Sequence, residues 1–368
     1  MTRARRQGRA VTTPGTAVAV SCSTSRARRL TALLAALAST ALLAGCAAAG
    51  AGDSSGAPAA TAAAASPATA SHAAETATTA RAVAATGTSG AAAGCNPYAS
   101  LAPQAGGPAV TAGSWAARIR VRGYLIAGVD QTTYHFGYLD ALNGQIEGLD
   151  IDMIKDVAAG IFGLSPDSAA LAAHIHFKAI DDAQRIPDVQ EGIVDIVAHT
   201  MTVNCDRMKD VDFSSIYYDA KQRVLVDAPA AGATAPDLAR LGAARQKVCA
   251  TSQSDSVAQI KAVGATAVQV PYWSDCLVLL EEGQVAGIST DDSILYGMQA
   301  QDPDTVITGP SLEDEPYGLA ISKAHPDFVR FVNAVLAADR ANGQWARSYR
   351  TWVSVSAPLP TWPIDYAG

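Results

Sequence analysis

Residues 47–94 contain no Leu, Ile, Phe, Tyr or Trp, and they consist almost entirely of Ala, Thr, Ser, Gly and Pro. A segment of this composition cannot bury enough apolar surface to offset the conformational entropy that folding removes. We therefore expect residues 46–94 to be a disordered tether. The folded part of this chain of 368 residues should begin near Cys95.

The first 45 residues have the pattern of a secretory signal. A basic patch at 26–29 precedes an apolar stretch from Leu30 to Leu43, which is shorter than the ~20 residues that a membrane-spanning helix needs. The stretch runs into Leu-Ala-Gly followed by Cys46, which resembles the lipobox of bacterial lipoproteins. The resemblance implies that residues 1–45 are removed and that Cys46 carries lipid; ordinary cleavage with a free thiol is the alternative. We expect an extracytoplasmic protein, anchored to the cell membrane by lipid and without another membrane span.

The expected mature chain is acidic. The whole sequence has a formal charge of −7, and its first 45 residues carry seven Arg and no acidic residue, so the remainder carries −14. A chain of that charge is repelled by phosphate backbones, which excludes nucleic acid as an expected partner.

Beyond the tether, short apolar strands alternate with amphipathic helices, a pattern that indicates an α/β architecture. The clearest strands are Gly123 to Val129 and Ile193 to Ala198. The clearest helices are Asp150 to Gly163 and Pro326 to Asn342, where apolar residues recur at helical spacing. The acidic run Glu313 to Glu315 is typical of a solvated loop.

One strand of this series ends in residues that suit an amino-acid ligand. Such a ligand needs a partner for its α-carboxylate, which the planar fork of Arg matches well, and an acid for its α-ammonium. In residues 195–207 an apolar strand ends in Thr200 and Thr202, and Arg207 follows. Ligands of open α/β sheets lie beyond the carboxyl ends of the strands. Hydroxyl-rich loops with an Arg are common, so this stretch alone is a weak signal.

Together with other motifs, however, the stretch resembles the polar-amino-acid branch of the family 3 extracellular solute-binding proteins of bacterial ABC importers. The resemblance covers about residues 115–352. The motifs that carry it follow in the family's order: Gly128-Val-Asp130, Phe136-Gly-Tyr138, Gly148-Leu-Asp-Ile-Asp152, Arg185-Ile-Pro187, Gly192-Ile-Val-Asp195, Thr200-Met-Thr202, Arg207, Asp212-Phe-Ser-Ser-Ile-Tyr-Tyr218, Lys247-Val-Cys-Ala250, Gly287-Ile-Ser-Thr-Asp291 and Glu315-Pro-Tyr-Gly318.

The resemblance implies a two-lobed α/β fold of the type II periplasmic-binding-protein kind, with two hinge strands. Lobe 1 would take residues 95–225 and 318–360, and lobe 2 would take residues 226–317. The crossings between the lobes would lie near Val224 and Tyr317. Binding would then shift an equilibrium between open and closed lobes.

The resemblance also implies roles for single residues. Arg207 matches the arginine that clamps the α-carboxylate, and Thr200 and Thr202 match positions that bond the same carboxylate and the ammonium. Asp291 matches the acid that holds the α-ammonium from the second lobe. Ser254 falls where a hydroxyl at a helix start touches the carboxylate, and the neighbouring Ser252 is a possible substitute for it.

Recognition of the ligand side chain is less specific. Arg185 matches a position that contacts the side chain in some binders of acidic amino acids; the alternative is a structural ion pair with Asp181, Asp182 or Asp188. Asp130 stands where some relatives with acidic ligands carry Arg and some with basic ligands carry Asp. The expected ligand is glutamate, aspartate, glutamine or asparagine.

Four cysteines remain beyond Cys46, an even number in an oxidising compartment. They allow three pairings. Because the lobe boundaries place each pair within one lobe, we expect disulfides Cys95–Cys205 and Cys249–Cys276. A metal site is the alternative, but the spacings contain no C-x-x-C element, and we expect none.

The resemblance implies a monomer that needs no cofactor, performs no catalysis and delivers its amino acid to the permease of an ABC importer. Two alternatives use the same fold. One is a sensor whose closed form meets a signalling receptor. The other is a dehydratase, for which His199 or Glu147 would be the candidate acid or base.

Overall fold

The computed structural model describes residues 94–353 and 359–367. The expected signal sequence, the expected lipidation site Cys46 and all of the expected tether except Gly94 lie outside the described residues. Within the described ranges, no helix combines the length and the apolar character that crossing a membrane requires.

Lobe 1 is built on a five-stranded sheet. Its strands follow the order β6 (Ile175–Ala179), β2 (Leu125–Val129), β7 (Ile196–Ala198), β15 (Ala320–Ile321) and β8 (Asp212–Phe213). Strand β2 runs parallel to β6 and β7, whereas β15 is antiparallel to both of its neighbours. Because β15 follows lobe 2 in the sequence, the chain returns after lobe 2 to complete the first sheet.

Helices cover this sheet on both faces. They are α1 (Trp115–Arg122), α2 (Leu149–Phe162), α3 (Arg185–Gln190), α8 (Pro326–Asn342) and α9 (Gln344–Trp352). Small sheets lie beside them: β3 (Thr132–Thr133) with β4 (Gly137–Leu139) and β5 (Ile146–Glu147), and β1 (Ala99–Leu101) with β16 (Asp365–Ala367).

The helix α2 packs its apolar stripe against this sheet and against α8. Ile151, Ile154 and Ile161 are fully buried in one core cluster with residues of α8. Gly160 looks unfavourable within a helix, but a Cβ there would lie 3.1 Å from Val335 Cγ2 on α8. A glycine at this position therefore permits α2 and α8 to approach closely, which explains its presence within a helix.

Lobe 2 has its own sheet and core. The strand order is β11 (Thr266–Val270), β10 (Lys247–Thr251), β12 (Gly287–Asp291), β9 (Tyr218–Asp227) and β13 (Thr305–Thr308), and β14 (Asp314–Tyr317) also pairs with β9. Its helices are α4 (Leu238–Ala243), α5 (Ser256–Ala262), α6 (Trp273–Glu281) and α7 (Asp292–Gln301). A separate cluster of buried side chains fills this lobe.

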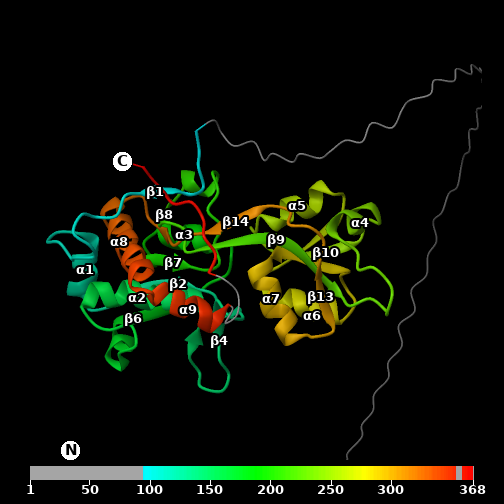
Figure 1. Cartoon of the computed structure of the whole chain (residues 1–368), viewed down its shortest axis with the longest axis horizontal. Helices are drawn as coiled ribbons and strands as arrows, with labels where there is room; N and C mark the ends of the chain where they lie inside the picture. The colour runs from blue at the N-terminus through cyan, green and yellow to red at the C-terminus, as the bar shows by residue number, and fades with distance from the viewer. Residues whose placement is uncertain (1–93, 354–358, 368) are drawn as a thin grey trace, which may run out of the picture. The chain divides into compact units, whose positions relative to one another are not determined.

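The strands β9 and β14 connect the lobes. The first part of β9, Tyr218 to Lys221, pairs with β14, and the rest pairs with β12 and β13 (Figure 1). Val224, expected at the crossing, instead pairs with Ser289 and Thr308 inside the second sheet. The crossing lies earlier in the strand. It was misplaced because β9 is one continuous strand of 10 residues, and the alternation of buried and less buried residues along it does not mark the point where its partner strand changes.

The structure contains disulfides Cys95–Cys205 and Cys249–Cys276, the two pairs named from the sequence. Each lies within one lobe. The first ties the start of the described chain to the loop before Arg207, and the second ties β10 to α6.

Replacing Cys249 and Cys276 together by serine is expected to lower the free energy of unfolding by about 3 kcal/mol. The bridge closes a loop between residues 27 apart, and its loss returns conformational entropy to the unfolded chain. A urea titration measures the change. Both proteins are compared without reductant, so that Cys95–Cys205 stays intact in each, and a midpoint of the double variant equal to that of the parent would contradict the prediction.

Candidate ligand-binding site

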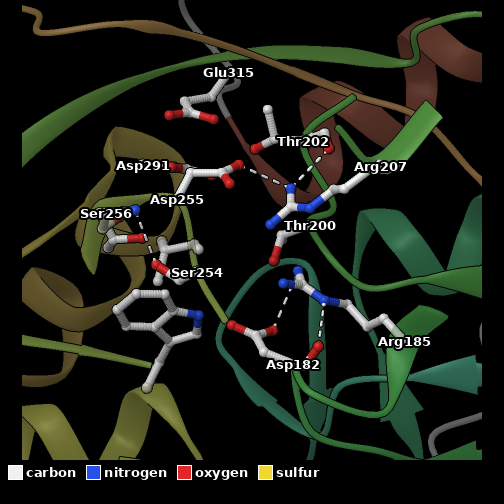
Figure 2. A pocket seen from close by; sticks show the side chains of 13 residues that line it. Asp182, Arg185, Thr200, Thr202, Arg207, Ser254, Asp255, Ser256, Asp291 and Glu315 are labelled. Atoms are coloured by element: carbon white, nitrogen blue, oxygen red, sulfur yellow. Dashed lines mark hydrogen bonds and ion pairs between the residues drawn. The ribbon is translucent and has the colours of Figure 1, made fainter. Parts of the chain in front are cut away.

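A pocket between the two lobes brings together most of the residues singled out from the sequence (Figure 2). Its lining comprises Asp182, Arg185, Thr200, Thr202 and Arg207 from lobe 1, Ser254, Asp255, Ser256, Trp273, Thr290, Asp291 and Ile294 from lobe 2, and Glu315 from β14. The space between these side chains is about 20 Å³, room for about one water molecule. The lobes must therefore separate before a molecule as large as an amino acid can enter.

Arg207 begins a short 3₁₀ turn, Arg207–Lys209, in the loop after β7. Its Nη1 donates to the carbonyl oxygen of Thr202 at 2.8 Å and pairs with Asp255 Oδ2 at 2.9 Å. Its Nη2 donates to the carbonyl oxygen of Gln253 at 3.3 Å. The guanidinium is thus held by its own loop on one side and meets lobe 2 on the other.

The two threonines lie directly beside Arg207 in the pocket. Thr200 has a φ of +40°, an uncommon conformation for a residue with a Cβ. Its N–H donates to Asp150 Oδ2 at 2.7 Å, and Tyr217 Oη donates to Asp150 Oδ1 at 2.6 Å. Burial raises the pKa of Asp150 to about 6, although both hydrogen bonds favour its charged form. This carboxylate at the start of α2 therefore holds the binding loop in place.

Asp291 ends β12 and enters the same pocket from lobe 2, opposite Arg207 (Figure 2). Tyr317 Oη donates to its Oδ2 at 2.5 Å, and Ser293 Oγ lies 2.6 Å from that phenol oxygen. Burial is the main cause that raises the pKa of Asp291 to about 7. The pocket thus has a cation on one wall and a titratable acid on the other.

Ser254 lines the pocket two residues before α5, and its Oγ accepts from the Ser256 N–H at 3.2 Å. The possible substitute Ser252 is not among the lining residues. The preceding Gln253 has a φ of +64°, a conformation usually left to glycine.

Arg185 both lines the pocket and forms the ion pair that was its structural alternative. Its Nη1 lies 3.2 Å from Asp182 Oδ1, and its Nε donates to the Asp182 carbonyl oxygen at 3.1 Å. Burial lowers the pKa of Arg185, and the Asp182 carboxylate opposes that effect. Asp182 Oδ2 also accepts from Thr251 Oγ1, so this pair connects the lobes.

Asp130 is not brought to the pocket, which corrects its expected place among the ligand-binding residues. It is 2% exposed, and its oxygens accept four hydrogen bonds from the next three residues. The donors are the N–H groups of Gln131 and Thr132 and the hydroxyls of Thr132 and Thr133. A carboxylate used in this way caps the turn after β2 and has no free edge for a ligand.

The acidic run Glu313 to Glu315 is also corrected, because it is not a solvated loop throughout. Glu315 belongs to β14, is 2% exposed and lines the pocket. Burial, together with the nearby carboxylates of Asp291 and Asp255, raises the pKa of Glu315 well above its usual range. The hydroxyl of Thr202 forms a hydrogen bond with this side chain.

Comparison with known families agrees with this architecture. The sequence profile of the bacterial extracellular solute-binding proteins, family 3, matches residues 125–355. The chain belongs to this family. Family 3 membership accounts for the two-lobed fold of the type II periplasmic-binding kind and for a cleft between the lobes.

Individual relatives and solved structures agree with this assignment. An ABC transporter glutamine-binding protein of Bacillus subtilis is 32% identical over 239 residues, which is 64% of this chain and 84% of that protein. The solved structure of an ancestral arginine-binding protein bound to glutamine matches with a TM-score of 0.56 and 29% identity, over 63% of this chain and 99% of that one. An ancestral amino acid-binding protein described as a precursor of cyclohexadienyl dehydratase matches with a TM-score of 0.55 and 27% identity, over 65% and 99%.

The sequence did not predict Asp182, Asp255 or Trp273 as residues of the binding site. Asp255 directly follows Ser254, so its position offered a signal. Asp182 lies three residues before Arg185 and was named only as its possible ion-pair partner, whereas no spacing along the chain relates Trp273 on α6 to the pocket.

Neither candidate acid or base group of a dehydratase, His199 or Glu147, is among the residues that line the pocket, although His199 Nδ1 lies 3.3 Å from Oδ1 of the lining residue Asp182. His199 is 2% exposed, and its Nε2 lies 3.0 Å from the carbonyl oxygen of Ile180. Glu147 lies on β5 and accepts from Asn143 Nδ2 at 2.8 Å.

Proposed function

We propose that this chain binds a polar α-amino acid between its lobes, without catalysing a reaction of it, and presents it to the permease of an ABC importer. One observation carries the proposal: Arg207 and Asp291 line a single pocket from opposite lobes. Arg207 is 8% exposed and Asp291 is 6% exposed. A zwitterion has one carboxylate for the guanidinium and one ammonium for the acid, and both need such partners once water is excluded.

The charge of the lining favours an amide over an acid as the ligand side chain. Four acids, Asp182, Asp255, Asp291 and Glu315, share the pocket with two arginines. Arg185 is already paired with Asp182. A further carboxylate would meet like charge, whereas a carboxamide can donate to an acid and accept from an arginine. Among the four expected ligands we therefore propose glutamine and asparagine, and the name of the Bacillus subtilis relative supports glutamine.

We further propose that Cys46 is lipidated and anchors a monomer to the outer side of the cell membrane. The order of basic patch, apolar stretch and Leu-Ala-Gly-Cys46 supports the anchor. The family's description as extracellular supports the compartment. In the proposal, residues 47–94 give the binding lobes reach above the membrane to meet the permease.

A thermal-shift screen of the purified chain against the twenty amino acids tests the function. L-glutamine at 100 times its dissociation constant should add about 2.7 kcal/mol to the free energy of unfolding. L-asparagine should give a smaller shift, and L-glutamate a smaller one still, because its side chain adds negative charge to an acidic pocket.

The matched control ligand is glutamine without its α-amino group, which keeps the carboxylate and the amide. It should give no shift at the same concentration. No shift with any of the twenty amino acids would contradict the proposed function, and an equal shift with the control ligand would contradict the role of Asp291.

A further inference from the structure

A carboxylate of the protein itself is bound to the arginine that is proposed to clamp the ligand. Asp255, in the loop before α5 of lobe 2, places Oδ2 2.9 Å from Arg207 Nη1. Both oxygens of Asp255 also lie 3.1 Å from Asn204 Nδ2, again in lobe 1. Every one of these contacts crosses the cleft, so Asp255 connects the lobes through a charge-assisted contact (Figure 2).

The loop of Asp255 uses both terminal nitrogens of the guanidinium. Nη1 is shared between Asp255 and the carbonyl oxygen of Thr202, and Nη2 donates to the carbonyl oxygen of Gln253. An α-carboxylate that binds Arg207 through both terminal nitrogens must therefore displace Asp255 and Gln253. The ligand and the loop compete for one group.

The ion pair also stands at the border of two spaces. Asp182, Arg185, Arg207 and Asp255 line the pocket described above and a second pocket of about 390 Å³, whose wall includes Ile186 and Met201. Because the two pockets share these four residues, the Arg207–Asp255 contact separates the small inner space from the larger outer one.

Electrostatics explains why such a contact belongs in a closing cleft. A guanidinium that is buried without a partner is strongly unfavourable. Closure over Arg207 therefore requires a carboxylate, either that of an amino acid or that of Asp255. With Asp255 in place the lobes can approach each other before a ligand is captured.

We infer that Asp255 is a built-in competitor for the α-carboxylate subsite, which closes the cleft on itself and lowers the affinity for amino acids. The inference rests on the proposed function of the same cleft. Binding is then an exchange of carboxylates on Arg207, in which the ligand displaces Asp255. The exchange sets a threshold concentration below which the cleft stays closed on its own side chain.

The variant Asp255→Asn tests the inference with L-glutamine as the probe. It removes the competing charge and keeps the size of a side chain that is 35% exposed, so the fold should tolerate it. The dissociation constant measured by titration calorimetry should fall about tenfold. Small-angle scattering of the variant without added amino acid should give a larger radius of gyration than that of the parent, and glutamine should remove this difference.

Two further variants complete the experiment. Asp206→Asn removes the same charge one residue before Arg207, where the carboxylate pairs with Lys209 rather than with the guanidinium, and it should change the dissociation constant less than twofold. Asp255→Ala should act in the same direction as Asp255→Asn. An affinity in both Asp255 variants that equals or falls below that of the parent would overturn the inference while leaving amino-acid binding intact. Absence of binding by the parent and by both variants would instead overturn the proposed function.

Discussion

Replacing Arg207 by alanine is expected to weaken the binding of L-glutamine at least a thousandfold, about 4 kcal/mol. Of the two arginines that line the pocket, Arg185 is paired with Asp182 of the same lobe, so the substitution removes the guanidinium whose acidic partner, Asp255, lies on the other lobe. Truncating one partner of a buried charge pair leaves the other charge desolvated, which typically costs 3–5 kcal/mol, about the loss expected here. Titration calorimetry measures the dissociation constants of both proteins.

Two further variants serve as controls for Arg207→Ala. Arg207→Lys keeps the charge but not the planar fork, so it should fall between the parent and the alanine variant. Arg350→Ala removes an exposed arginine on α9 and should leave the affinity unchanged. A dissociation constant for Arg207→Ala within tenfold of the parent would remove Arg207 from the clamp.

The second large effect is expected at Asp291. Asp291→Asn should weaken binding about a hundredfold or more, because the ammonium loses its charged partner in a site from which water is excluded. The asparagine oxygen can still accept from Tyr317 Oη, which lies 2.5 Å from the present carboxylate. The loss of affinity should therefore result from the missing negative charge rather than from a structural change at the end of β12.

The affinity of the parent should also depend on pH. Burial raises the pKa of Asp291 to about 7; the nearby acids Asp255 and Asp292 act in the same direction, and Arg207 and Tyr317 oppose it. Below pH 7 the free protein holds a proton that an incoming ammonium must displace, so affinity should fall by up to about tenfold per pH unit as the pH drops. Above pH 7 it should level off.

Asp291→Asn supplies the control for this pH dependence, since it has no carboxyl group to titrate at that position. Its weaker binding should change less between pH 5.5 and 8 than that of the parent, because only the buried carboxyl groups of Asp150 and Glu315 remain to titrate in the site. A parent whose affinity rises as the pH falls would contradict the assignment of Asp291 to the ammonium.

Regular elements with a strong periodic pattern could be predicted closely from the sequence. The helix expected from Pro326 to Asn342 is α8 with the same bounds, and α2 begins and ends within one residue of its expected range. Both helices bury an apolar stripe, and that burial is what the spacing of apolar residues reports. The strand β14 was missed because its acidic residues resemble a loop, although Glu315 is buried in the cleft.

The residues of the candidate site also fall into those that the sequence pattern could place and those that it could not. Residues at or shortly after a strand end, such as Asp291, Thr200 and Thr202, could be placed because the sheet sets their position. The competitor Asp255 could not, since its partner Arg207 lies 48 residues earlier and on the other lobe. Asp130 was misplaced because a carboxylate beside a turn can serve either a ligand or the turn itself, and only the hydrogen bonds after β2 decide between them.

The disulfide Cys95–Cys205 has a mechanical consequence. It fastens the first described residues of the chain to the loop that carries Thr202 and Arg207. A pulling force that reaches Cys95 from its N-terminal side therefore passes through a covalent bond into lobe 1, two residues from the guanidinium. Under the proposed lipid anchor at Cys46, lobe 1 is therefore the anchored lobe, and lobe 2 moves relative to it through β9 and β14.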